Sequence, residues 1–379
     1  MAMPTLRANT PRRGFGFRSP WTVPLVLMLA VASAGAQAPA QPAEPVAPPI
    51  TDAAGNPLPN SISTLEQVTL GGVEQWIQIR GADIDNPILL VLHGGPGFAM
   101  TAWTELYQRP ELERHFTVVN WDQRGAGKSY APDLTPSDMT VAKLVADTLQ
   151  LTELLRARFH QDKIFLTGHS WGSALGFLAV QQRPELYHAY IASAEAVSWN
   201  RRQQMSYDWV LEQARNAGDT DIVAALEALD PFDPTNPAHV DVKDGLLDRY
   251  RGGDLYTPGL WDEYLAYAFE GRSPYYTDAE VNTYMAGMEL SRRTLDTEFA
   301  TSDYDLFRDF PVSPIPIHFL VGRHDHSTPG ELAQEYYQFL QAPAKSFTWF
   351  ANSGHTLMFD EPDRWAQELI RIARETLGR

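Results

Sequence analysis

An α/β fold with a mainly parallel sheet and helices on both faces is predicted for this chain, and two patterns predict it. Short apolar runs alternate along the chain with segments of helical periodicity. Each residue pattern that suggests chemistry directly follows one of these runs, and ligands of parallel sheets bind at the carboxyl ends of the strands. A chain of 379 residues, 44% of them hydrophobic, is long enough to bury a large core.

The expected elements begin with a β-hairpin. The alternating stretches Leu65–Leu70 and Val73–Ile79 are joined by Gly71-Gly72, and glycine permits the positive φ of a tight turn. The buried strands expected next are Ile88–Leu92, Phe116–Trp121, Ile164–Thr167, Ala189–Ala192, Ile317–Val321 and Phe347–Phe350. Helices are expected at about 140–158, 171–182, 330–340 and 361–377. This alternation predicts a parallel sheet between two helical layers.

Residues 1–38 have the pattern of a signal peptide. A segment with four arginines and no acidic residue precedes the apolar run Val23–Ala32, and small residues follow that run. The run is about half of the roughly 20 residues that span a bilayer, so no stable membrane anchor is expected. We expect cleavage near Ala36 or Ala38 and export to the periplasm or the medium, by either the Sec or the twin-arginine route.

Composition narrows the classes of function. The formal net charge is −17 and no basic stripe is visible, which argues against a nucleic-acid partner. Because the chain has no cysteine, disulfides, thiolate metal sites and a cysteine nucleophile are excluded. Residues 39–60 are rich in Ala and Pro and lack apolar periodicity, so they are expected to form an extended linker, with the folded part starting near Ser61.

The residues Gly168-His169-Ser170-Trp171-Gly172 follow a buried strand and open a helix. In this pattern small residues on both sides of the serine allow a strained turn that lifts the hydroxyl above the sheet. The same turn aims the helix N-terminus, with its unpaired amides, at the site. Ser170 is therefore the predicted nucleophile, and the N–H of Trp171 is the expected oxyanion donor.

A second glycine-rich turn, His93-Gly94-Gly95-Pro96-Gly97, also follows a buried strand. Such a turn brings backbone N–H groups close to a substrate carbonyl, and Gly95 is the candidate for the second oxyanion donor. His93 precedes the nucleophile in the chain, and His169 adjoins it in the elbow with a side chain expected to point away from the serine. We expect both histidines to be structural.

The general base is expected last in the chain, in the loop after the final strand, where His355 lies. Imidazole suits the role because its pKa is near neutrality, so it takes the serine proton and returns it to the leaving group. Asp325 follows the preceding strand and completes the order Ser, Asp, His. Glu195 is a rival acid or a binding residue, and Asp360 is a weaker rival.

Three motifs in order resemble a known family: His93–Gly97, Asp122–Ser129 (sequence DQRGAGKS) and Gly168–Ser173. Together they resemble the proline iminopeptidases, a branch of the α/β-hydrolase superfamily. The resemblance covers roughly residues 61–197 and 305–379. It implies an α/β-hydrolase fold with an eight-stranded sheet, a helical cap at about 198–304 inserted after the sixth strand, no metal and no cofactor. It also implies that Asp122–Ser129 is a structural turn.

The chain departs from that family in two places. Family members usually have Gly where His169 stands. They also hold the free α-amino group of the substrate with carboxylates of the cap, in local patterns that are absent here. Glu263, Glu270 and Glu289 are possible substitutes, although a glutamate on an acidic helical cap is more often a surface charge. The cap is rich in aromatic residues, some expected in its own core and others in an apolar pocket over Ser170.

The expected mechanism is acyl transfer to Ser170, with an acyl-enzyme that water hydrolyses. The substrate is expected to be a small molecule or a short peptide. The first hypothesis is an aminopeptidase that releases N-terminal proline or a similar small residue. The alternatives are a carboxylic ester hydrolase, acting on a hydrophobic or antibiotic-like ester, and a catalytically inactive binding module on the same fold. The sequence leaves the oligomeric state open.

Overall fold

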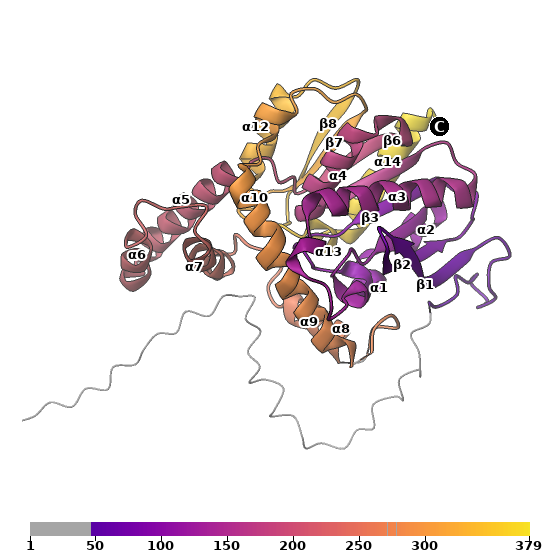
Figure 1. The fold of residues 1–379 in the computed structure, drawn as a ribbon, viewed down its shortest axis with the longest axis horizontal. Helices are drawn as coiled ribbons and strands as arrows, with labels where there is room; N and C mark the ends of the chain where they lie inside the picture. The colour runs from indigo at the N-terminus through magenta and orange to yellow at the C-terminus, as the bar shows by residue number, and fades with distance from the viewer. Residues whose placement is uncertain (1–46, 271, 278) are drawn as a thin grey trace, which may run out of the picture.

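The computed structural model describes residues 47–270, 272–277 and 279–379. The predicted signal peptide, residues 1–38, and residues 39–46 of the predicted linker lie outside the described residues. The described part is built on one eight-stranded sheet with helices on both faces (Figure 1). The predicted fold class is therefore confirmed.

The strands lie in the order β1-β2-β4-β3-β5-β6-β7-β8. The pairs β1–β2 and β2–β4 are antiparallel, and the other neighbouring strands run parallel. The strand bounds are β1 Ile62–Leu70, β2 Val73–Gly81, β3 Ile88–Leu92, β4 Thr117–Trp121, β5 Ile164–His169, β6 Tyr187–Ser193, β7 Ile317–Gly322 and β8 Lys345–Phe350. Each of these strands was expected from the sequence. The carboxyl ends of β3, β5, β7 and β8 thus share one edge of the sheet, where the predicted site lies.

Two layers of helices cover the sheet, and each layer has its own core. Successive side chains of a strand point to opposite faces, so Leu90 of β3 packs in the core shared with α3, α4 and α12, whereas Leu89 packs in the core shared with α14. The helices outside the cap are α1 Thr104–Tyr107, α2 Pro110–His115, α3 Val141–Phe159, α4 Trp171–Gln182, α11 Leu306–Asp309, α12 Gly330–Phe339, α13 Leu357–Asp360 and α14 Pro362–Leu377.

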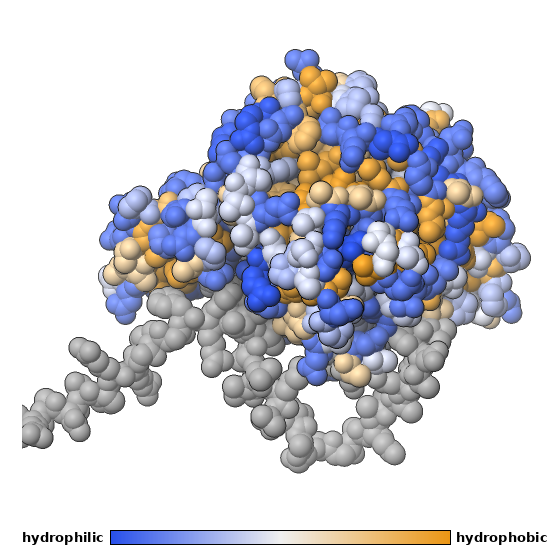
Figure 2. Space-filling model, in the orientation of Figure 1, coloured by the Kyte–Doolittle hydropathy of each residue, from blue (hydrophilic) through white to orange (hydrophobic). Residues whose placement is uncertain are grey.

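A helical segment is inserted between β6 and β7 and forms the cap. Its helices are α5 Trp199–Ala217, α6 Thr220–Glu227, α7 Pro237–Leu247, α8 Leu260–Phe269, α9 Glu280–Ser291, a π-helical turn at Arg292–Asp296 and α10 Thr297–Ser302. Helices α5, α6 and α7 share a small hydrophobic core of their own and project from the main body (Figure 1). Hydrophilic and hydrophobic side chains both lie on the viewed face of this lobe (Figure 2).

Part of residues 47–60 packs against the sheet, which corrects the expected extended linker for the described part of residues 39–60. Thr51 and Pro57 form an isolated β-bridge. The carbonyl oxygen of Pro48 accepts hydrogen bonds from Ser63 Oγ of β1 and Arg80 Nη1 of β2, both at 2.6 Å. Proline lacks a donor but keeps its carbonyl acceptor, so a proline-rich segment pairs with side-chain donors of the sheet.

The motif Asp122–Ser129 contributes a buried ion pair to the core. Arg124 Nε lies 2.7 Å from Asp147 Oδ2 and Arg124 Nη2 lies 2.9 Å from Asp147 Oδ1, and both side chains are buried. Arg124 Nη2 also donates to the carbonyl oxygens of Leu70 and Gly71 in the hairpin turn. One guanidinium thus joins the loop after β4, the β1–β2 hairpin and helix α3.

Replacing Asp147 with Asn is expected to lower the free energy of unfolding by about 3 to 5 kcal/mol, because the Arg124 charge stays buried without its counter-ion. Urea denaturation of the purified protein measures this loss. The matched control is Glu335→Gln, which breaks an exposed pair with Arg201 and should change the free energy by about 1 kcal/mol or less. Equal effects of the two substitutions would contradict a structural role for the buried pair.

Candidate active site

The turn between β5 and α4 holds Ser170 in a strained conformation. Its φ is +54° and its ψ is −119°, values that non-glycine residues rarely adopt. A Cβ on Gly168 would lie 2.2 Å from the carbonyl oxygen of Gly172, and a Cβ on Gly172 would lie 2.3 Å from that of Leu92. Only glycine fits at both places, so the sequence pattern around the serine is a steric requirement of the turn.

The structure brings Ser170, His355 and Asp325 together at the carboxyl edge of the sheet. His355 Nε2 lies 2.8 Å from Ser170 Oγ, and His355 Nδ1 lies 2.9 Å from Asp325 Oδ2. All three side chains are buried. They come from the ends of β5, β7 and β8, with His355 185 residues after Ser170 and 30 residues after Asp325. This arrangement suits proton transfer from the serine hydroxyl to the imidazole.

The carboxylate of Asp325 accepts hydrogen bonds from other residues besides His355. Asp325 Oδ1 accepts the backbone N–H groups of Ser327 and Thr328 at 2.9 Å each, and Thr328 Oγ1 donates to Asp325 Oδ2 at 2.8 Å. Burial alone would raise the pKa of Asp325, but the charge and hydrogen bond of His355 and the Thr328 donors outweigh it, so this pKa is lowered. Asp325 is therefore ionised at neutral pH.

The charge of Asp325 also acts on the imidazole. Burial alone would lower the pKa of His355, but the charge of Asp325 and its hydrogen bond outweigh burial, so the net shift of this pKa is upward. The hydrogen bond at Nδ1 fixes the tautomer that leaves Nε2 free to accept the serine proton.

The two expected oxyanion donors lie beside the serine. Gly95, Trp171 and Ser170 line a narrow cavity of about 20 Å³. Gly95 has φ +112°, and a Cβ there would lie 2.6 Å from the backbone nitrogen of Phe98. Trp171 is the first residue of α4, where backbone N–H groups have no partner within the helix. The positions of both residues agree with their expected role.

Both ring nitrogens of His93 have hydrogen-bond partners in the neighbouring loops. Its Nε2 accepts the backbone N–H of Gln123 at 3.1 Å, and its Nδ1 lies 2.9 Å from the carbonyl oxygen of Gly94, to which it donates. Burial lowers its pKa to about 4, so the ring is neutral at physiological pH. Gln123 Oε1 in turn accepts a hydrogen bond from Trp171 Nε1 at 3.0 Å. His93 thus orders the loops around the elbow.

His169 does not point away from the site, which corrects the sequence expectation. Its ring lines the cavity at Ser170, and its Nε2 lies 3.0 Å from the carbonyl oxygen of His355. A buried carbonyl needs a donor, and the elbow places this ring where it supplies one. Burial lowers the pKa of His169 to about 3. The neutral ring therefore fixes the backbone of His355 rather than competing for its proton.

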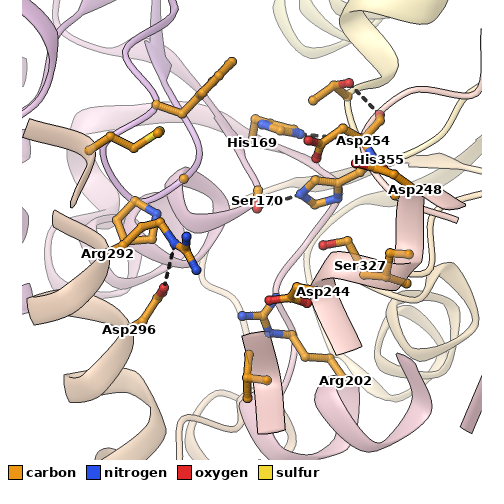
Figure 3. Close-up of a pocket in the computed structure, with 18 of the residues that line it drawn as sticks. His169, Ser170, Arg202, Asp244, Asp248, Asp254, Arg292, Asp296, Ser327 and His355 are labelled. Atoms are coloured by element: carbon orange, nitrogen blue, oxygen red, sulfur yellow. Dashed lines mark hydrogen bonds and ion pairs between the residues drawn. The ribbon is translucent and has the colours of Figure 1, made fainter. Parts of the chain in front are cut away.

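The cavity above Ser170 has a volume of about 100 Å³ and is lined by the core loops and the cap. Two of the aromatic cap residues, Trp199 and Trp261, line it together with Phe98, while others, such as Tyr275 and Tyr284, are buried in the packing between cap and core. Four aspartates reach the cavity: Asp244, Asp248, Asp254 and Asp296 (Figure 3). The cavity is therefore polar and acidic as well as aromatic.

None of the three cap glutamates proposed for substrate binding lines this cavity. Glu263 and Glu270 are exposed on or just after helix α8. Glu289 is exposed on α9 and lines a neighbouring cavity of about 250 Å³ instead. The helices turn their outer faces, which carry these glutamates, to solvent. The structure offers aspartates in their place.

Glu195 is buried behind the nucleophile turn and lines neither cavity at Ser170. Its Oε1 accepts from Ser173 Oγ at 3.2 Å, and its Oε2 has no hydrogen-bond partner. Burial raises the pKa of Glu195 to about 8, so the carboxyl group is protonated at neutral pH. It is placed neither to bind substrate nor to replace Asp325.

The sequence reasoning assigned none of the four cavity aspartates to the site, and Asp248 and Asp254 are the two that lie on the side of His355. They flank the sequence Arg249-Tyr250-Arg251-Gly252-Gly253, whose glycines mark a turn after α7. The Asp254 N–H donates to Asp248 Oδ1 at 3.1 Å. The Asp254 carbonyl accepts from Thr356, next to His355, through N at 2.8 Å and Oγ1 at 2.6 Å. The segment after α7, which begins with the short 3-10 helix Asp248–Tyr250, thus carries both carboxylates to the site.

The part of the chain that the structure describes brings together no group of three or more His, Asp or Glu side chains that would hold a metal ion. Within that same part, no helix is both long and apolar enough to cross a membrane.

Comparison with known proteins defines the class to which this fold and site belong. The model of the α/β hydrolase family matches residues 88–368. The chain belongs to the α/β-hydrolase family, and it is a hydrolase.

Its relatives narrow the family to the proline iminopeptidase type. The chain is 33% identical over 326 residues to the probable aminopeptidase YbaC of Bacillus subtilis (strain 168), covering 85% of this chain and 99% of that protein. It is 23% identical over 291 residues to a proline iminopeptidase of Heyndrickxia coagulans, covering 73% of this chain and 87% of that protein. The crystal structure of the proline iminopeptidase of Mycobacterium smegmatis superposes with a TM-score of 0.62 at 18% identity, covering 83% of this chain and 98% of that one. The last comparison shows a common fold.

Replacing Glu195 with Gln is expected to change how stability depends on pH. A carboxyl group whose pKa rises from 4.5 to about 8 on folding binds more protons in the folded state, so wild-type stability falls as pH rises between these values. Relative to wild type, the free energy of unfolding of the variant should rise by about 3 to 4 kcal/mol between pH 5 and pH 8. Urea unfolding at both values measures the gain. Exposed Glu185→Gln is the control, and a variant profile parallel to wild type would contradict the buried protonated state.

Proposed function

We propose that this hydrolase is an aminopeptidase that uses Ser170 as its nucleophile, His355 as its general base and Asp325 as the acid that orients the base. The observation that carries the proposal is the continuous hydrogen-bonded path from Ser170 Oγ through the imidazole to the buried carboxylate. The names of the relatives support the substrate class, and the signal-peptide pattern at the N-terminus supports an exported enzyme.

In this mechanism His355 Nε2 takes the proton of Ser170 Oγ as the oxygen attacks the carbonyl carbon of the substrate's first residue. The N–H groups of Gly95 and Trp171 stabilise the oxyanion of the tetrahedral intermediate. The imidazolium then gives its proton to the leaving amine, and an acyl-enzyme remains. Water, activated by the same imidazole, hydrolyses the ester and restores Ser170.

The acidic cavity supports a substrate with a free amino group. Asp244 forms an ion pair with Lys243, and Asp296 lies 3.8 Å from Arg292. Asp248 and Asp254 form no ion pair with a cation of the described residues. Burial, followed by the charge of Asp248, raises the pKa of Asp254 to about 7. A substrate ammonium group supplies the positive charge that exposed Asp248 and partly buried Asp254 lack.

Matched substrates test the proposed activity on the mature protein. We expect proline p-nitroanilide, which has a free amine, to be cleaved much faster than its N-acetylated form, because only the free amine forms an ion pair with the cavity. Ser170→Ala should abolish turnover, since no other hydroxyl is bonded to His355 Nε2. Turnover of p-nitrophenyl esters with neither anilide cleaved would contradict the aminopeptidase and favour an ester hydrolase.

Asp254→Asn is expected to raise the KM for proline p-nitroanilide by about 10- to 100-fold, the equivalent of one lost charge-assisted hydrogen bond. Turnover of p-nitrophenyl acetate, which has no amine, should change much less. In the wild type the KM for the anilide should fall as pH rises through about 7, because Asp254 then ionises. The neighbouring exposed variant Asp262→Asn is the control. An unchanged KM in Asp254→Asn would place the amine elsewhere.

A further inference from the structure

Arg202 of helix α5 is a cavity cation without an anionic partner. Its side chain lines both the cavity of about 100 Å³ and the narrow cavity at the oxyanion donors, in each case together with Ser170. Its guanidinium forms no ion pair and no hydrogen bond with the described residues. Five N–H donors without an acceptor are unusual for an arginine in a protein cavity.

The other two cations near this cavity are paired. Lys243 forms an ion pair with Asp244 and donates to Gln203 Oε1. Arg292 lies 3.8 Å from Asp296 and 3.6 Å from Asp241. The carboxylates whose charges act most strongly on Arg202 are those of Asp296 and Asp244. Both are thus engaged with other cations. Arg202 alone among these three cations has all of its donors available.

Packing holds the Arg202 guanidinium in place without using its donors. It lies over the ring of Trp199, 4.4 Å from the ring centroid, in a cation–π contact. The indole is itself fixed, because Trp199 Nε1 donates to the carbonyl oxygen of Pro234 at 2.9 Å. In Figure 3, Arg202 reaches the cavity from the cap below Ser170, whereas Asp254 and Asp248 lie on the side of His355. The cavity therefore has unpaired charges of opposite sign in different places.

We propose that Arg202 binds a carboxylate of the substrate, so that the enzyme acts on short peptides that carry both a free amino group and a free carboxylate. A planar guanidinium with open donors matches a carboxylate in a two-point hydrogen bond. The proposal rests on the aminopeptidase function proposed above and adds the second charged group of the substrate.

The carboxylate has two chemical sources, the C-terminus of a dipeptide or an acidic side chain, and three substrates distinguish them. Prolyl-leucine carries a C-terminal carboxylate, prolyl-leucinamide carries none, and prolyl-glutamic acid amide carries only the side-chain carboxylate. We expect wild type to cleave prolyl-leucine with a kcat/KM about 10- to 100-fold above that of its amide. If prolyl-glutamic acid amide, and not prolyl-leucine, has this advantage in kcat/KM over prolyl-leucinamide, the site binds an acidic side chain instead of a C-terminus.

Arg202→Gln should remove this preference, so that kcat/KM falls about 10- to 100-fold more for the preferred carboxylate substrate than for prolyl-leucinamide. Arg202→Lys should restore part of it, because the charge returns without the two-point geometry. The matched control is Arg201→Gln, one residue earlier on α5, whose side chain pairs with Glu335 on the exposed surface. A wild type without the preference, or an Arg202→Gln enzyme that keeps it, would overturn the proposal.

A second readout separates this proposal from the aminopeptidase function. Hydrolysis of p-nitrophenyl acetate needs neither a free amine nor a carboxylate, so inhibition of that reaction reports binding alone. N-acetylleucine should inhibit the wild-type enzyme more strongly than N-acetylleucinamide does. The two compounds should inhibit the Arg202→Gln enzyme equally. If this difference is present while proline p-nitroanilide is not cleaved, the carboxylate site stands and the aminopeptidase function fails. If the two compounds inhibit wild type equally while proline p-nitroanilide is cleaved, the carboxylate site fails and the aminopeptidase function stands.

Discussion

The strained turn at Ser170 is the constraint on which the rest of the site depends. Gly168 and Gly172 let the end of β5 and the start of α4 approach the carboxyl end of β3, which carries the loop with Gly95. The residue before the serine, His169, binds the carbonyl oxygen of His355 at 3.0 Å. One turn therefore sets Ser170, the loop of Gly95 and the backbone of His355 relative to one another.

The cap is joined to this rigid edge through polar contacts at several places. Tyr276 donates its hydroxyl to Asp122, and Trp103 Nε1 donates to the carbonyl oxygen of Tyr264 at 2.8 Å. The loop that carries Asp254 is bonded to the loop of His355 through Thr356. The proposed substrate contacts and the proposed proton transfer thus depend on one connected set of loops, and catalysis requires reacting groups to be positioned precisely.

The sequence was informative where one local pattern has one physical meaning. Alternating stretches predicted the antiparallel hairpin β1–β2, and apolar runs predicted the strands from β3 to β8. The order of motifs predicted which strand ends bring Ser170, Asp325 and His355 together. The cap was different, because its glutamates lie on the outer faces of helices, and a single sequence does not reveal which face turns inward. Asp248 and Asp254 escaped notice because the segment after α7 positions them, and the ring of His169 was misplaced because its partner is a backbone carbonyl 186 residues away.

Charges that are partly buried and have no partner are costly, and the cavity contains one of each sign, Asp254 and Arg202. The cost of keeping Asp254 ionised is visible in its raised pKa, and desolvation likewise lowers the pKa of Arg202. These groups do not neutralise one another, because the protein holds them apart on different sides of Ser170 (Figure 3). A ligand with both charges removes both costs at once, whereas a ligand with one charge leaves a partly buried group unpaired. The proposed selectivity then arises from the charges that the cavity leaves without partners, and the aromatic rings of Trp199 and Trp261 add contact area without specifying a charge.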